Sequence, residues 1–71
     1  MANESAKALI AQTARDLSQA NIDKAGAATQ YASVTKDNGS AAMTATQATQ
    51  FANSLANHTT SVPAVVSALG L

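Results

Sequence analysis

The feature that most restricts the fold of this chain is the stretch 40–57, SAAMTATQATQFANSLAN, which is rich in alanine and carries no Asp, Glu, Lys or Arg. Small and apolar residues recur along it at spacings of three and four, which on a helix form one continuous seam. The seam consists of Ala41, Ala45, Ala48, Ala52 and Leu55. Small side chains let a second helix approach closely, toward the short end of the usual range of about 8–10 Å between axes. The stretch therefore predicts a helix from about 41 to 57 that lies against other helices.

The preceding residues also follow helical spacing, and we expect one helix from about 4 to 35. Asn3 can cap its start, and Glu4 in the first turn favours the helix dipole. The segment 36–40, Lys-Asp-Asn-Gly-Ser, then predicts a turn, with Ser40 as the cap of the next helix. A connection this short makes the two helices antiparallel neighbours.

The tail, 61–71, is distinct in composition. Pro63 suits the first turn of a helix, and Ser61 is a candidate cap. One apolar stripe then follows at positions i, i+3, i+4 and i+7, formed by Val62, Val65, Val66 and Leu69. A short element this apolar is expected to fold back on the hairpin or to dock onto a neighbouring subunit.

The predicted fold class is all-α: one domain over 1–71, an antiparallel helical hairpin with a short apolar C-terminal helix, packed in an oligomer. Oligomerisation is expected because eighteen of the 71 residues are alanine and large apolar side chains are few, while a chain this small has a marginal core. The predicted subunit interface combines the seam, the aromatic residue beside it and the tail stripe. Its residues are Ala41, Ala45, Ala48, Phe51, Ala52, Leu55, Val62, Val65, Val66 and Leu69.

The sequence offers no constellation of reactive side chains. There is no cysteine and only one histidine, His58, so a metal site is not expected. The four acidic residues are scattered, no serine lies in a nucleophile elbow, and the three glycines form no phosphate loop. We therefore expect no enzyme activity, no catalytic residue and no cofactor.

Charge and hydropathy restrict the partners. The net charge is zero, whereas a nucleic-acid-binding protein usually carries an excess of basic residues. We therefore expect no nucleic acid as a partner. No run approaches the roughly 20 apolar residues that a membrane-spanning helix needs. After Met1 there is no basic region followed by an apolar run, so we expect cytoplasmic synthesis without a cleaved signal peptide, with the final location open.

The leading functional hypothesis is a structural subunit that self-assembles into a filament, tube, ribbon or virion or phage particle, with copies of itself or other subunits as partners. The expected architecture is similar to that of the needle subunits of bacterial secretion systems. The run Ala42 to Ser61, rich in Ala, Gln, Thr and Asn, resembles in composition the proteins that build bacterial R-bodies. The alternatives are a membrane-active or toxin-like peptide and a small helical adaptor that binds one partner protein.

Overall fold

The N-terminal half forms two helices where the sequence predicts one. The computed structural model describes residues 2–71, and Met1 lies outside the described part of the predicted domain. Helix α1 spans Glu4–Ser18 and helix α2 spans Lys24–Ala32. Helix α1 ends in a Schellman motif, in which the Ala20 N–H donates to the Leu17 carbonyl at 3.2 Å and the Asn21 N–H donates to the Asp16 carbonyl at 2.9 Å. The chain then turns, so that α2 packs back against α1.

Side-chain caps fix where the other helices begin. Asp23 starts α2 by accepting from the Gly26 N–H at 2.7 Å. Helix α3 (Ala45–Ala56) begins at a reciprocal capping box between Thr44 and Gln47. Helix α4 (Val62–Ala68) is capped by Ser61, which accepts from the Ala64 N–H at 3.4 Å.

Two of the caps expected from the sequence have other roles. Ser40 lies in the loop before α3 and bonds to Asn38. Asn3 precedes α1 in a left-handed conformation and makes no side-chain cap. Instead its side-chain oxygen accepts from the Asp37 N–H at 3.0 Å, while its own N–H donates to Asp37 Oδ2 at 2.7 Å. These two reciprocal bonds tie the start of α1 to the loop before α3.

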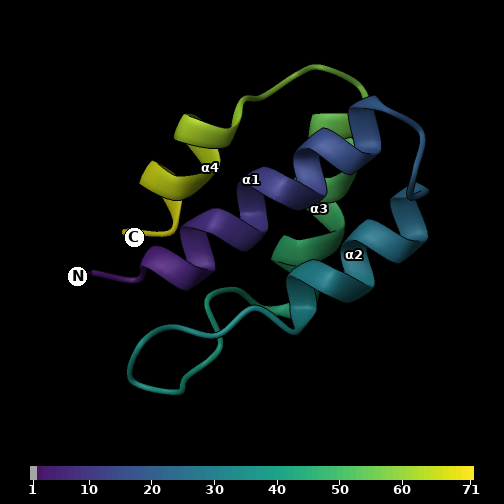
Figure 1. Ribbon diagram of the computed structural model, residues 1–71. Coiled ribbons are helices and arrows are strands. Elements are labelled where there is room, and N and C mark those ends of the chain that lie inside the picture. Colours follow the sequence, from purple (N-terminus) through teal and green to yellow (C-terminus); the bar gives the residue numbers. More distant parts are fainter. Residues whose placement is uncertain (1) are drawn as a thin grey trace.

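The four helices form an all-α fold (Figure 1), so the predicted fold class is confirmed at that level. Helices α2 and α3 make the most extensive pair, α1 packs against both, and α4 lies beside α1. Within residues 2–71 there is no strand, and the only β-type pairing is an isolated bridge between Thr35 and Ala41. The molecule measures 30 × 19 × 18 Å.

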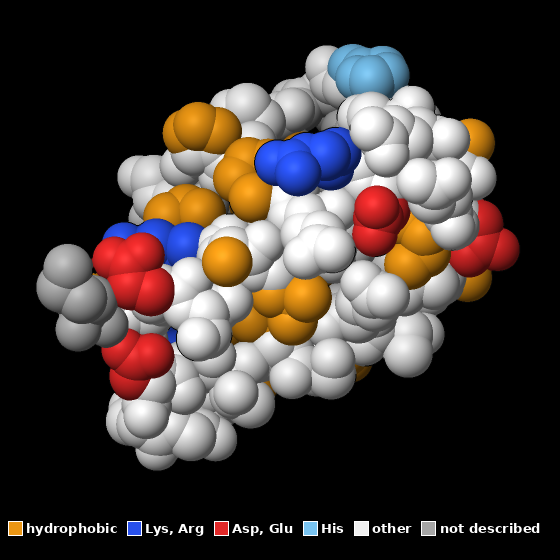
Figure 2. All heavy atoms as spheres, in the orientation of Figure 1, with side chains coloured by type: hydrophobic (Ala, Val, Ile, Leu, Met, Phe, Trp, Pro, Cys, Tyr) orange, Lys and Arg blue, Asp and Glu red, His pale blue; other side chains and the backbone are white. Residues whose placement is uncertain are grey.

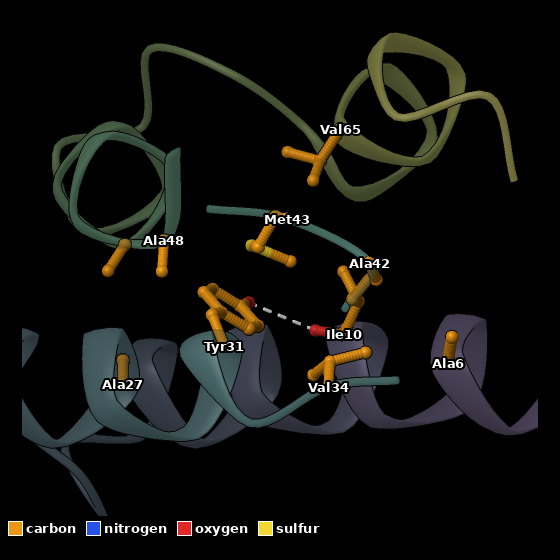
Figure 3. Close-up of a cluster of buried hydrophobic side chains, with 10 residues drawn as sticks. Ala6, Ile10, Ala27, Tyr31, Val34, Ala42, Met43, Ala48 and Val65 are labelled. Carbon is orange, nitrogen blue, oxygen red and sulfur yellow. Dashed lines mark hydrogen bonds between the residues drawn. The ribbon is translucent and has the colours of Figure 1, made fainter. Parts of the chain in front are cut away.

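The core is centred on Tyr31 of α2, whose side chain has no exposed surface. Its hydroxyl donates to the backbone carbonyl of Ile10 in α1 at 3.0 Å, which joins the two helices across the interior (Figure 3). The other buried hydrophobic side chains of the core come from all four helices and from the loop before α3. They are Ala6, Ile10, Ala27, Val34, Ala42, Met43, Ala48, Ala52 and Val65. One chain therefore encloses a core of its own.

The single buried polar side chain in the described residues is also satisfied. Thr13 of α1 has no exposed surface, and its hydroxyl donates to Gln30 Oε1 of α2 at 2.8 Å. Within residues 2–71, no buried side-chain nitrogen or oxygen lacks a hydrogen-bond partner. Every buried side-chain polar atom in the described part of the chain is therefore paired, as is usual in protein interiors.

Candidate interaction surface

The apolar stripe of α4 is divided between the core and the surface. Val65 is fully buried, whereas Val62, Val66 and Leu69 are half-buried. Successive residues of a helix are 100° apart around its axis, so the other three stripe residues all lie to one side of Val65. Leu69 is the nearest to Val65 around the axis, Val62 is next, and Val66 is the farthest. Val62 and Leu69 pack against the core, but Val66 belongs neither to the core cluster nor to the side chains packed on it. Val66 is therefore the outer edge of the stripe.

A groove adjoins this stripe. A hollow of about 440 Å³ lies between the C-terminal half of α1 and the segment that joins α3 to α4. Its apolar lining is formed by Ala11, Ala14, Leu55 and Val62, and its polar lining by Arg15, Ser18, Gln19, His58 and Thr60. Because Val62 belongs to both features, the groove continues the apolar surface of α4. We call the stripe and the groove together the α4 surface.

Figure 2 shows this region from one side. Hydrophobic side chains lie over α4 and the adjoining part of α1, with white surface between them and Lys or Arg side chains beside them on two sides. The segment 59–71 contributes no Asp, Glu, Lys, Arg or His. Burial of the α4 stripe alone would therefore desolvate methyl groups and hydroxyls rather than ionised side chains, which avoids the largest cost of forming an interface.

The two basic groups of the groove are explained by their positions at helix ends. Arg15 lies in the last turn of α1, where a cation interacts favourably with the helix dipole. His58 has φ 58° and follows the C-cap of α3, where the Thr59 N–H donates to the Ser54 carbonyl at 2.9 Å. No carboxylate lines the groove to pair with either group. Neither basic group therefore has an acidic partner in the groove lining.

A second hollow, of about 450 Å³, lies at the junction of α1 and α2. It is lined by Leu17, Ala20, Asn21, Ile22, Asp23, Lys24 and Ala56. The Asp23 carboxylate is already engaged as the cap of α2. This hollow therefore presents mainly apolar surface, and no cluster of convergent reactive groups.

The ten residues of the predicted interface are divided between core and surface. Ala48, Ala52 and Val65 are fully buried in their own chain, so these three are committed to the subunit's own packing. The other seven retain exposed surface. Phe51, Leu55, Val62, Val66 and Leu69 are half-buried, and Ala41 and Ala45 are exposed.

One large apolar residue outside the predicted interface is exposed in the described part of the chain. Leu9 is 37% exposed, although its neighbour Ile10 is fully buried. Since Leu9 and Ala11 are 200° apart on α1, Leu9 lies away from the flank that lines the groove. An isolated exposed leucine of this kind is ordinary on a protein surface.

Residues 2–71 contain no group of three or more His, Cys, Asp or Glu side chains that could hold a metal ion. The longest described helix, α1, has 15 residues, and none of the helices described is long and apolar enough to cross a bilayer. The α4 surface is therefore the strongest candidate for a functional region among the described residues.

Comparison with known proteins adds no relative: no family model, curated protein or solved structure matches the chain. A functional proposal for it must therefore rest on its own surface and core.

Proposed function

We propose that this chain is a structural subunit that associates with copies of itself through the α4 surface. The observation that carries the proposal is the position of Val66, a half-buried valine outside the packed core, at the edge of an apolar face. A second copy would cover this valine together with the half-exposed parts of Val62 and Leu69. Each square ångström of apolar surface removed from water contributes about 25 cal/mol.

Charge supports association between identical copies. The net charge is zero, so two copies approach without net repulsion. Within the α4 surface, Arg15 and His58 line the groove, and the four residues of the stripe are uncharged. Contacts that repeat head to tail would build a filament, tube or ribbon, and contacts that close would build a ring or shell.

The enclosed core determines how such an assembly would form. Tyr31, Ile10 and Val65 are already buried within one chain, so assembly would add folded subunits rather than fold them on contact. A moderate interface would then suffice, because it would not also have to offset the cost of ordering the chain.

The test is Val66→Asp, with Ser67→Asp as the matched control. Ser67 is exposed on the same helix one residue further along, so both variants add one carboxylate to α4. Sedimentation velocity and electron microscopy should show large species for the natural chain and for Ser67→Asp, but only monomer for Val66→Asp, with equal helix content by circular dichroism. Assembly of Val66→Asp at the concentration that suffices for the natural chain would contradict the proposal.

The enclosed core also favours a second candidate, a small adaptor that uses the groove to bind one partner helix. A chain that buries its own core can act as a monomer, and an apolar groove of this kind suits an amphipathic helix. Sedimentation separates the two functions, because an adaptor stops at monomer or dimer while a structural subunit continues to larger species.

A further inference from the structure

The loop between α2 and α3 holds the side chain of Asn38 in a specific conformation. Asn38 Oδ1 accepts two hydrogen bonds from Ser40, one from the backbone N–H at 3.0 Å and one from the hydroxyl at 2.6 Å. Since the oxygen bonds to the residue two positions further on, the side-chain amide is folded over the peptide between Asn38 and Gly39. Asn38, Gly39 and Ser40 are all exposed to water.

From this geometry we propose that Asn38 is a site of spontaneous deamidation, with water as the only co-reactant. The backbone nitrogen of Gly39 attacks Cγ of Asn38 and gives up its proton, a new N–Cγ bond closes a five-membered succinimide, and Nδ2 takes up a proton and leaves as ammonia. Water then adds to one of the two ring carbonyls. The product at position 38 is an aspartyl residue or, when the other ring bond opens, an isoaspartyl residue.

The loop favours the first step in two ways. The two Ser40 donors point at the oxygen that becomes negatively charged when Gly39 attacks, so they stabilise the tetrahedral adduct as oxyanion donors do in enzymes. Gly39 has no side chain to obstruct the approach, and outside residues 38–40 no atom lies within 4 Å of the position a Cβ would take. The competing contact is the 2.9 Å bond from the Gly39 N–H to the Lys36 carbonyl, which must open first.

The other asparagines lack this combination. Asn53 lies inside α3, where the helix holds the backbone, and Asn21 is followed by the branched side chain of Ile22. Asn57 and Asn3 are followed by His58 and Glu4. Reaction should therefore be selective for position 38.

Deamidation there would act on the connection between the loop and the start of α1. The new carboxylate would lie beside Asp37, whose carboxylate and N–H hold Asn3. An isoaspartyl linkage would also lengthen the backbone inside the turn closed by the Lys36 N–H and the Ser40 carbonyl, 2.8 Å apart. The modification would thus loosen a turn that leads directly into the buried Ala42 and Met43.

The test follows the conversion of each asparagine by fragment mass spectrometry during incubation of the full chain at mildly alkaline pH. Position 38 should convert first, to a mixture of aspartyl and isoaspartyl products. Ser40→Ala removes the hydroxyl donor and should slow conversion about three- to tenfold, the rate equivalent of one hydrogen bond. Ser67→Ala, which alters an exposed serine on α4, should convert at the natural rate.

A measurement in concentrated urea separates the loop geometry from the local sequence. In the unfolded state, Ser40→Ala and the natural chain should convert at the same rate. An equal rate in the folded state, a rate difference that persists in urea, or earlier conversion of another asparagine would each overturn the proposal.

Discussion

The single tyrosine of the chain gives a direct measure of how well the core is closed. Burial raises the pKa of Tyr31 from 10.0 to about 12, because an ionised phenolate would lose its hydration in a side chain with no exposed surface. A change of this size corresponds to about 2.7 kcal/mol, at 1.36 kcal/mol for each pH unit. The folded state therefore holds the phenol proton more tightly than the unfolded state.

The sign of the pH dependence follows. Below pH 10 the phenol is protonated in both states, so its contribution to stability is constant and complete. As the pH rises from 10 toward 12, the unfolded chain loses the proton first, and the free energy of unfolding falls by about 1.4 kcal/mol for each pH unit. Near pH 12, where the folded phenol ionises as well, the loss reaches its full value.

Tyr31→Phe is the matched variant, since it keeps the ring and removes only the hydroxyl. At neutral pH it should be less stable than the natural chain by about 0.5–1.5 kcal/mol, because the hydroxyl no longer bonds the Ile10 carbonyl. Above pH 10 the variant lacks the titrating group. Its stability should therefore exceed that of the natural chain above about pH 11. There, ionisation of Tyr31 in the unfolded state has cost the natural chain more stability than the Tyr31–Ile10 hydrogen bond contributes.

Two assays test this prediction. Ultraviolet titration of tyrosinate absorbance reports Tyr31 alone, as the sequence has one tyrosine and no tryptophan. Urea denaturation of both proteins at several pH values gives the two stability curves. A titration midpoint near 10 in the folded protein, or stability curves that stay parallel up to pH 12, would refute the reasoning and show that the ring is open to water.

Four further substitutions test the helix ends, the first turn of α2 and the seam by chemical denaturation. Ala20→Gly should stabilise the fold by about 0.5–1 kcal/mol, because Ala20 has φ 59° and glycine adopts this conformation without strain but gains entropy when unfolded. Gly70→Ala should destabilise the fold, because Gly70 has φ 71° and alanine is strained in this conformation. Gly26→Ala should destabilise by about 1 kcal/mol, since a Cβ would lie 2.8 Å from Ile22 Cγ1 and the contact outweighs the gain in helix propensity; a more stable variant would show that Ile22 moves freely. Ala48→Leu should cost about 1–3 kcal/mol by overpacking a fully buried position, and unchanged stability would mean that the seam is not a close contact.

Periodicity and composition were sufficient to predict an all-α fold, but not the break within its N-terminal half. Residues 19–23 continue a helical spacing of apolar positions, and nothing there resembles the Asn-Gly pair that marks the later turn. The structure ends α1 with an alanine at φ 59°, a residue type that propensity favours inside helices. Tertiary packing prevails here, because the turn lets Tyr31 return to Ile10 and close the core.

The start of α3 was misplaced for a related reason. Ser40 and Thr44 are both suitable caps, and Ser40 follows a glycine turn directly. Thr44 has the advantage of Gln47 three residues later, which completes a capping box. The segment between them is then free to bury Ala42 and Met43 in the core. A single sequence does not reveal that Ala42 and Met43 must be buried, because their burial depends on which core side chains the other helices leave uncovered.

The use of the alanine seam inside one molecule changes where an interface can be. The small residues of α3 pack against the chain's own helices, and Ala48 and Ala52 are fully buried there. A second copy could therefore not contact this part of the seam unless the chain unfolded. In the proposed function, association would then use the outer edge of α4 and its groove, where Val66 lies outside the core packing. The small residues Ala48 and Ala52 pack inside the chain, whereas Val66 would contact a second copy. Val66→Asp and Ala48→Leu should accordingly have separate effects, the first on assembly with the fold intact and the second on the stability of the fold itself.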